Sequence, residues 1–81
     1  MQASDIEQLI QANLPDAQVL VRGDDGVHFE ATVISETFVG KSLLQQHRQV
    51  YATLGERLGN EEIHALAVKT YTPADWQQRQ S

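Results

Sequence analysis

The chain has 81 residues, contains no cysteine, and carries a formal charge of −5 from 11 acidic and 6 basic residues. This length predicts one small domain over residues 1–81, and the lack of cysteine excludes disulfides, thiolate catalysis and an all-cysteine metal site within the chain. The acidic balance opposes non-specific binding to nucleic acid, whose affinity comes mainly from Lys and Arg at phosphates, but it is compatible with a local basic patch.

The sequence carries no export or membrane signal that we recognise. Residues 1–14 form an acidic amphipathic segment without the basic start and apolar core of a signal peptide. Apolar runs all stay well below the roughly 20 residues of a membrane span. We therefore expect a soluble cytoplasmic protein with no membrane contact.

The first predicted element is a helix that ends before Pro15, because the residue before a proline is pushed away from helical geometry. Ser4-Asp5-Ile6-Glu7 has the pattern of a capping box, in which the serine and the glutamate each satisfy backbone groups at a helix start. The apolar residues that share one face of this helix are Ile6, Leu9, Ile10 and Leu14.

Two strands with alternating polarity follow, over residues 17–22 and 27–35. One face of the second strand carries Val27, Phe29, Ala31 and Val33. The other face carries His28, Glu30, Thr32 and Ile34. Gly23-Asp24-Asp25-Gly26 is typical of a tight turn, so the two strands are predicted to form a β-hairpin.

After a connection over residues 36–41, a second capping box at Ser42 and Gln45 starts another helix. Its predicted apolar stripe consists of Leu43, His47, Val50 and Leu54, with Leu44, Tyr51 and Leu58 beside it. Glycine weakens a helix interior, so the helix either bends at Gly55 or continues to a stop at Gly59-Asn60.

The third predicted strand covers residues 63–71 and is apolar on both sides, which indicates a central or covered strand. A final helix begins at Thr72-Pro73-Ala74-Asp75, where threonine caps and proline takes the first helical position. Trp76, the only tryptophan, is expected to close the core.

These elements predict an α+β fold with αββαβα order and a three-stranded mixed sheet that has helices packed on one face. The third strand follows a helix, so it should pair parallel with one strand of the hairpin.

Two catalytic motifs are considered and set aside. Gly40-Lys41-Ser42 matches the end of a phosphate-binding loop, but the motif requires a glycine where Ser35 stands. A turn, a solvated lysine and a helix cap explain the tripeptide.

Serine, histidine and carboxylates are present without the local signature of a catalytic triad, and a chain of this size has little room for a substrate cleft. We therefore do not expect the protein to be an enzyme.

Pattern alone does not select one of the three histidines. His47 lies on an apolar helix stripe, which favours a core or boundary residue, and His28 is a strand histidine of the kind usually exposed. His64 begins the third strand and, taken by itself, also favours a structural role. Their spacing gives no metal-site signature.

Two sequence blocks nevertheless resemble the BolA family. They are FVGKSLLQQHR at 38–48 and IHALAVKTYTPADW at 63–76, with Val50-Tyr51 and Leu54 between them. The resemblance covers nearly the whole chain, and the compact hairpin is most similar to the short-loop bacterial, IbaG-like branch, which is associated with acid stress.

The resemblance implies a domain similar to the class II KH fold and a partnership with a monothiol glutaredoxin. The two proteins would hold a bridging 2Fe-2S cluster, shared with glutathione and absent from the isolated protein, which would be a monomer or weak homodimer. His64 matches the family's cluster-binding histidine. Imidazole in place of thiolate raises the cluster potential, which suits cluster transfer or sensing.

The chain also departs from the family pattern. Many members carry a second ligand, histidine or cysteine, in a longer loop between the first two strands. Here that loop is only residues 23–26 and contains neither, so His28 is the nearest substitute. His47 resembles the family's helix histidine, which we interpret as structural.

The KH-like resemblance raises an alternative, a nucleic-acid-binding transcriptional regulator. Its candidate phosphate contacts are Lys41, Arg48 and Lys69. Gly23 and Gly26 have the spacing of the KH glycine loop, but they lie in a predicted hairpin turn and not between two helices.

Overall fold

A computed structural model describes residues 2–23, 28–55 and 65–80 of the chain. Its elements, in chain order, are α1 (Ala3–Asn13), β1 (Gln18–Arg22), β2 (His28–Ile34), the 3-10 helix η1 (Glu36–Phe38), α2 (Leu43–Leu54), β3 (Ala65–Tyr71) and α3 (Pro73–Gln80). The predicted αββαβα order is confirmed, with one short 3-10 turn added in the connection after β2.

The three strands form one mixed sheet in the order β1-β2-β3. β1 pairs antiparallel with β2, which confirms the predicted hairpin, and β3 pairs parallel with β2. The prediction that the third strand is central or covered is wrong, because β2 is central and β3 lies at an edge. Its outward positions include exposed Ala67, and alanine is small enough to sit on either side of a sheet without deciding which side is buried.

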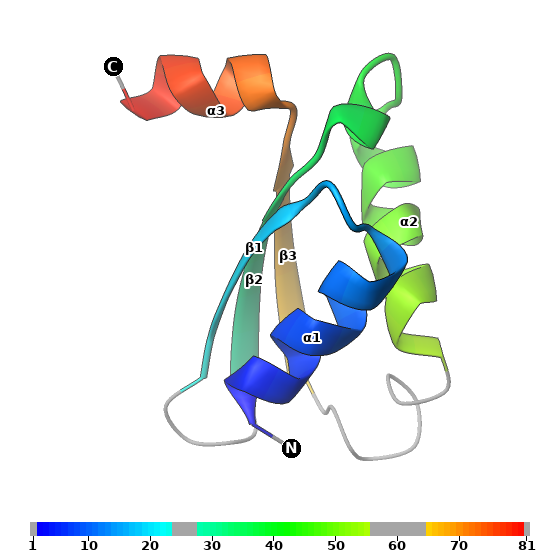
Figure 1. Cartoon of the computed structure of the whole chain (residues 1–81), viewed down its shortest axis with the longest axis vertical. Coiled ribbons are helices and arrows are strands. Elements are labelled where there is room, and N and C mark those ends of the chain that lie inside the picture. Colours follow the sequence, from blue (N-terminus) through cyan, green and yellow to red (C-terminus); the bar gives the residue numbers. More distant parts are fainter. Residues whose placement is uncertain (1, 24–27, 56–64, 81) are drawn as a thin grey trace.

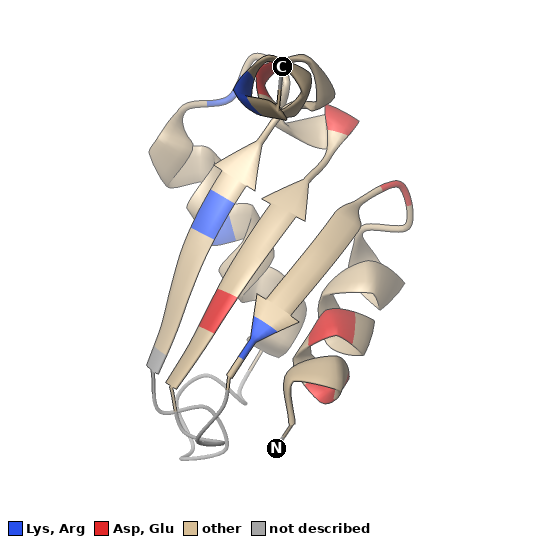
Figure 2. Ribbon diagram, turned by 90° about the vertical axis from the view of Figure 1, so that its left-hand side faces the viewer, with Lys and Arg blue, Asp and Glu red and all other residues tan. Residues whose placement is uncertain are grey.

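Helices α1 and α2 lie together on one face of the sheet, whereas α3 projects beyond the end of the sheet on the other side (Figure 1). The core lies between the sheet and the first two helices. Residues with no exposed surface in this core are Ile6, Ile10, Ala31, Val33, Phe38 and Val50. The face of the sheet away from α1 and α2 is turned to the viewer in Figure 2. The strand residues that line a hollow on this face are Leu20, Arg22, Glu30, Thr32, Lys69 and Tyr71.

The predicted apolar face of the first helix is confirmed, with Ile6, Ile10 and Leu14 buried and Leu9 packed against them. Its predicted start is wrong by two residues, since the cap is Gln2 and not Ser4, and the helix begins at Ala3. The helix is capped at Gln2, whose backbone N–H donates to the Asp5 carboxylate at 2.9 Å. Asp5 therefore takes the role expected of Glu7, because it stands three residues after the observed cap.

The second capping box is confirmed. The Ser42 backbone N–H donates to Gln45 Oε1 at 2.9 Å, and the Gln45 N–H donates to Ser42 Oγ at 3.2 Å. The predicted buried stripe is wrong at its start, since Leu43 and Leu44 are 64% and 60% exposed. A helical period sets the direction of a side chain but does not ensure that another element lies opposite it.

The unexpected core member of α2 is Gln46, which is 8% exposed. Its amide nitrogen donates to the carbonyl of Lys41 at 2.9 Å, and its Oε1 accepts from the Thr70 hydroxyl at 2.7 Å. Each end of the amide is thus satisfied, which removes the cost of burying a polar group. The contact ties the start of α2 to β3.

Two glycines have a steric role. Gly55 ends α2 with φ +57°, in a region that residues with a Cβ rarely adopt, so the regular helix stops there. The predicted bend into a second short helix falls on residues outside the described part of the chain. The alternative stop at Gly59-Asn60 lies outside the described residues. A Cβ at Gly23 would run into the ring of Phe29, so the hairpin needs glycine at this position.

The last helix begins as predicted, since the Asp75 N–H donates to the Thr72 hydroxyl at 3.2 Å. The expectation that Trp76 closes the core is wrong. Trp76 is half-buried outside the core and packs against the ring of Tyr71, with the ring centroids 5.1 Å apart. Since α3 projects away from the core layer, its aromatic residue covers the end of the open sheet face.

Among the described residues, no helix is long and apolar enough to cross a membrane.

Candidate functional site

His28 lies at the first position of β2 and is exposed. Its neighbours in the strand alternate, so buried Phe29 faces the core while His28 and exposed Glu30 face the other side of the sheet. The imidazole is therefore displayed at one end of the open face. The opposite end of the same face is the one that α3 approaches.

His64, the other predicted ligand, lies outside the described residues. In the sequence it directly precedes Ala65, the first residue of β3, and the parallel register pairs Ala65 with His28. The structure thus describes one of the two predicted ligands, His28. The other, His64, immediately precedes the described residues of β3 in the sequence.

The available donors make an incomplete ligand set. Across residues 2–23, 28–55 and 65–80, no group of three or more His, Asp or Glu side chains is placed to hold a metal ion. The whole chain lacks cysteine, so any thiolate at this end of the sheet has to come from another molecule. An exposed imidazole at a strand end fits a shared metal group, to which each partner supplies part of the ligand set.

His47 is half-buried on α2, consistent with the boundary position predicted for it. The tripeptide Gly40-Lys41-Ser42 also has the predicted local roles. Ser42 caps α2, and Lys41 is exposed and donates from Nζ to Gln49 Oε1 at 2.7 Å.

The three cations proposed for nucleic-acid contact do not form one patch. Lys41 and Arg48 line the same shallow surface on the outer side of α2, together with Gln45 and Gln49. Lys69 lies on the open face of the sheet, where its Nζ is 3.2 Å from a carboxylate oxygen of Glu30. The structure therefore joins Lys41 with Arg48 and separates both from Lys69.

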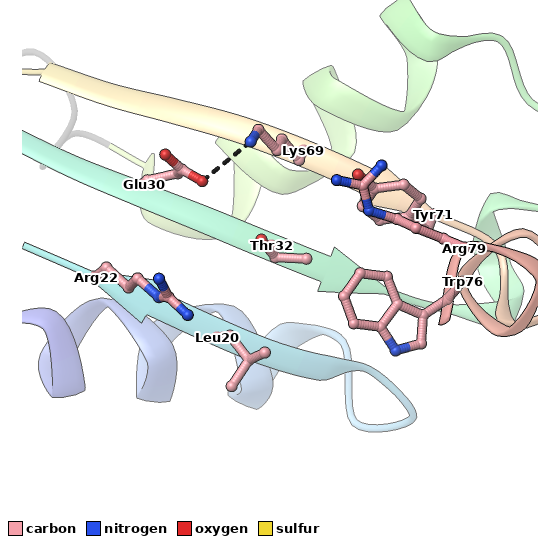
Figure 3. A pocket seen from close by; sticks show the side chains of 8 residues that line it. All are labelled: Leu20, Arg22, Glu30, Thr32, Lys69, Tyr71, Trp76 and Arg79. Atoms are coloured by element: carbon pink, nitrogen blue, oxygen red, sulfur yellow. Dashed lines mark ion pairs between the residues drawn. The ribbon is translucent and has the colours of Figure 1, made fainter. Parts of the chain in front are cut away.

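A hollow of about 180 Å³ on the open sheet face was not predicted from the sequence (Figure 3). The hairpin contributes Leu20, Arg22, Glu30 and Thr32. The C-terminal part contributes Lys69, Tyr71, Trp76 and Arg79. The alternating strand pattern could have indicated the polar residues that line the hollow. The contribution of Trp76 depends on the position of α3, which the sequence does not specify.

The family model described as "BolA-like protein" matches residues 10–75. Acid stress protein IbaG of Escherichia coli (strain K12) is 36% identical over 76 residues, which cover 94% of this chain and 89% of that protein. The DNA-binding transcriptional regulator BolA of Vibrio cholerae is 46% identical over 66 residues, covering 82% of this chain and 60% of that protein.

Solved structures show the same fold. A bolA protein homologue from Coxiella burnetii is similar with a TM-score of 0.85 and 42% identity, covering 95% of this chain and 97% of the other. The BolA domain of SufE1 from Arabidopsis thaliana is similar with a TM-score of 0.75 and 30% identity, covering 89% and 92%.

Proposed function

This chain belongs to the BolA-like protein family, and we propose on that basis that it is a non-enzymatic adaptor that handles iron–sulfur clusters together with a monothiol glutaredoxin. In this proposal the two proteins form a heterodimer that holds a bridging 2Fe-2S cluster. The cluster is cargo that the pair passes on, and the activity is linked to stress response, in keeping with the name of the Escherichia coli relative.

One observation carries the proposal for this chain. His28 is exposed at the start of β2 and is paired with Ala65, the residue that follows His64 in the sequence. Of the two candidate histidines, the described one, His28, thus lies at one end of a parallel strand pair, and His64 is adjacent in sequence to the residue in register with it. Histidine nitrogen is a suitable iron ligand, and in clusters with mixed ligation it replaces thiolate on one iron.

The missing cysteines explain why a partner is needed. A 2Fe-2S cluster is normally held by four ligands, mostly thiolates, and this chain has no thiolate to supply. A glutaredoxin cysteine and glutathione would supply the thiolates, while His64, with His28 as the nearest second candidate, would supply imidazole. The cluster itself contributes the capacity to accept or release one electron and to be transferred intact.

Visible circular dichroism tests this pairing. We expect that titrating the protein into cluster-loaded glutaredoxin changes the spectrum up to a one-to-one ratio, because replacing a ligand alters the chiral environment of the iron. A spectrum that stays unchanged through the titration would contradict the proposal. Bovine serum albumin at the same concentration controls for non-specific protein addition.

A second candidate function is transcriptional regulation through DNA. The Vibrio cholerae relative is named as a DNA-binding transcriptional regulator, and here Lys41 and Arg48 lie on one surface of α2. Duplex binding at low salt that weakens in the Lys41→Ala variant would favour this candidate, since each lost phosphate contact reduces both affinity and salt dependence.

A further inference from the structure

The open face of the sheet differs in charge from the rest of this acidic protein. Three of the six basic residues of the chain, Arg22, Lys69 and Arg79, line its hollow, and the only acidic residue among those lining it is Glu30. Arg22 lies on β1 and Lys69 on β3, the two edge strands, and Figure 2 shows basic residues on the outer strands of the sheet and an acidic residue on the middle strand. The face thus has a local positive excess within a chain of net charge −5.

Ion pairing within the face does not cancel this excess. Lys69 pairs with Glu30 at 3.2 Å, but both side chains are about half exposed, at 53% and 50%. Exposed pairs of this kind are weak, so a phosphate can compete for the lysine. Arg22 and Arg79 are exposed at other positions around the hollow.

An aromatic wall closes one end of the hollow. The ring of Tyr71 lies against Trp76, with the centroids 5.1 Å apart and the planes tilted by 54°. Arg79 lies over the Tyr71 ring at 5.5 Å from its centroid. Trp76 is half-buried and still lines the hollow, as Figure 3 shows, so part of its ring is available for a planar ligand to stack on.

The strand register spreads the cations along the face. Arg22 is in register with Glu30, whereas Lys69 is in register with Thr32, two residues further along and on the opposite edge strand. Strand geometry therefore separates the Cα atoms of Arg22 and Lys69 by roughly 12 Å. Positive charge distributed in this way suits a chain of phosphates better than a single one.

We propose that the open sheet face of β1, β2 and β3 binds single-stranded nucleic acid, with an unpaired base stacked on Trp76 and the backbone following Arg22, Lys69 and Arg79. Aromatic rings that stack bases beside a basic surface are the general means by which proteins bind single strands. A duplex is disfavoured because its bases are already stacked. An acidic peptide would use the cations but would leave the aromatic wall without a planar partner. The inference goes beyond both candidate functions. It places the nucleic acid on the open sheet face and not on the α2 surface of Lys41 and Arg48, with Lys69 as the one cation shared with the alternative, and it needs neither a cluster nor glutaredoxin.

Intrinsic fluorescence provides the test, because Trp76 is the only tryptophan in the chain. We titrate the full-length protein with an eight-nucleotide oligothymidine at low salt. The expected result is saturable quenching of Trp76 emission, with log K falling against log salt at a slope of about −2 for three contacted phosphates. The absence of saturable quenching would overturn the proposal. So would equal binding of a duplex or of polyglutamate, measured by competition.

Matched variants locate the site. Arg22→Gln should weaken binding several-fold and reduce the salt slope by about 0.7. Gln8→Glu changes the net charge by the same single unit on exposed α1 and should leave both values unchanged. Glu30→Gln should strengthen binding by removing the acidic competitor. Equal effects of Arg22→Gln and Gln8→Glu would mean that only net charge matters, which would contradict a site on this face.

Discussion

Replacing His64 by alanine is expected to abolish the circular-dichroism change that the wild-type protein produces in cluster-loaded glutaredoxin. The chain has no cysteine, so a lost imidazole cannot be replaced by a thiolate of the same chain. When this ligand is lost, its position on the iron can be taken only by water or by a ligand from a second glutaredoxin. The measurement is the same visible titration, with the wild-type and variant proteins run in parallel.

His28→Ala separates the two predicted ligands. If His28 completes the ligand set, this variant should still bind glutaredoxin but should lose the cluster faster, as measured by the decay of visible absorption. His47→Ala is the matched control, because His47 lies on α2 and not at the end of the sheet. A wild-type response from His64→Ala, or an equal loss of response in all three variants, would refute cluster ligation by His64 and His28.

Replacing Phe38 by alanine is expected to lower the free energy of unfolding by about 3–5 kcal/mol. Phe38 is fully buried where η1 ends, in the same core cluster as Val50 and Leu54. A domain of this length has a total stability of roughly 4–12 kcal/mol, so the variant would lose a large part of it.

Urea unfolding followed by far-ultraviolet circular dichroism measures this loss. Val39→Ala is a control at the adjacent position, where the side chain is 66% exposed, and should change the free energy of unfolding by no more than about 0.5 kcal/mol. A loss below about 1 kcal/mol for Phe38→Ala would contradict the view that the Phe38 side chain of η1 stabilises the core.

Local signals in the sequence predict most of the fold. Proline, glycine and capping residues specify where elements begin and end, and the cap at Ser42 and the helix start at Thr72-Pro73 are both found as predicted. The alternation of β2 predicts which of its faces is buried, because successive strand residues point to opposite sides.

Properties that depend on which element lies opposite are less predictable. Leu43 and Leu44 have the right period for a core face, yet no described element covers them. Gln46 is buried because it finds carbonyl and hydroxyl partners on the loop before α2 and on β3, and a count of apolar residues cannot detect such partners. The sequence predicts that Trp76 closes the core, but the direction of α3 places it on the other side of the sheet.

The candidate site shows the same division. His28 could be predicted to be exposed from its strand position alone, whereas its pairing with Ala65 depends on the parallel register of two strands far apart in the sequence. Lys41, Arg48 and Lys69 were grouped by charge, and only the structure separates Lys69 from the other two. The assignment of His64 as a cluster ligand stays a prediction, which rests on the resemblance of its sequence block to the family and falls on a residue outside the described part of the chain.

Anaerobic co-purification tests the central claim most directly. The tagged protein is produced together with a monothiol glutaredoxin, isolated without oxygen, and separated by size exclusion before iron and acid-labile sulfide are measured. The account predicts a one-to-one heterodimer that carries two iron and two sulfide ions, and their loss when His64 is replaced by alanine. A protein that elutes without glutaredoxin, or a heterodimer without iron and sulfide, would contradict it.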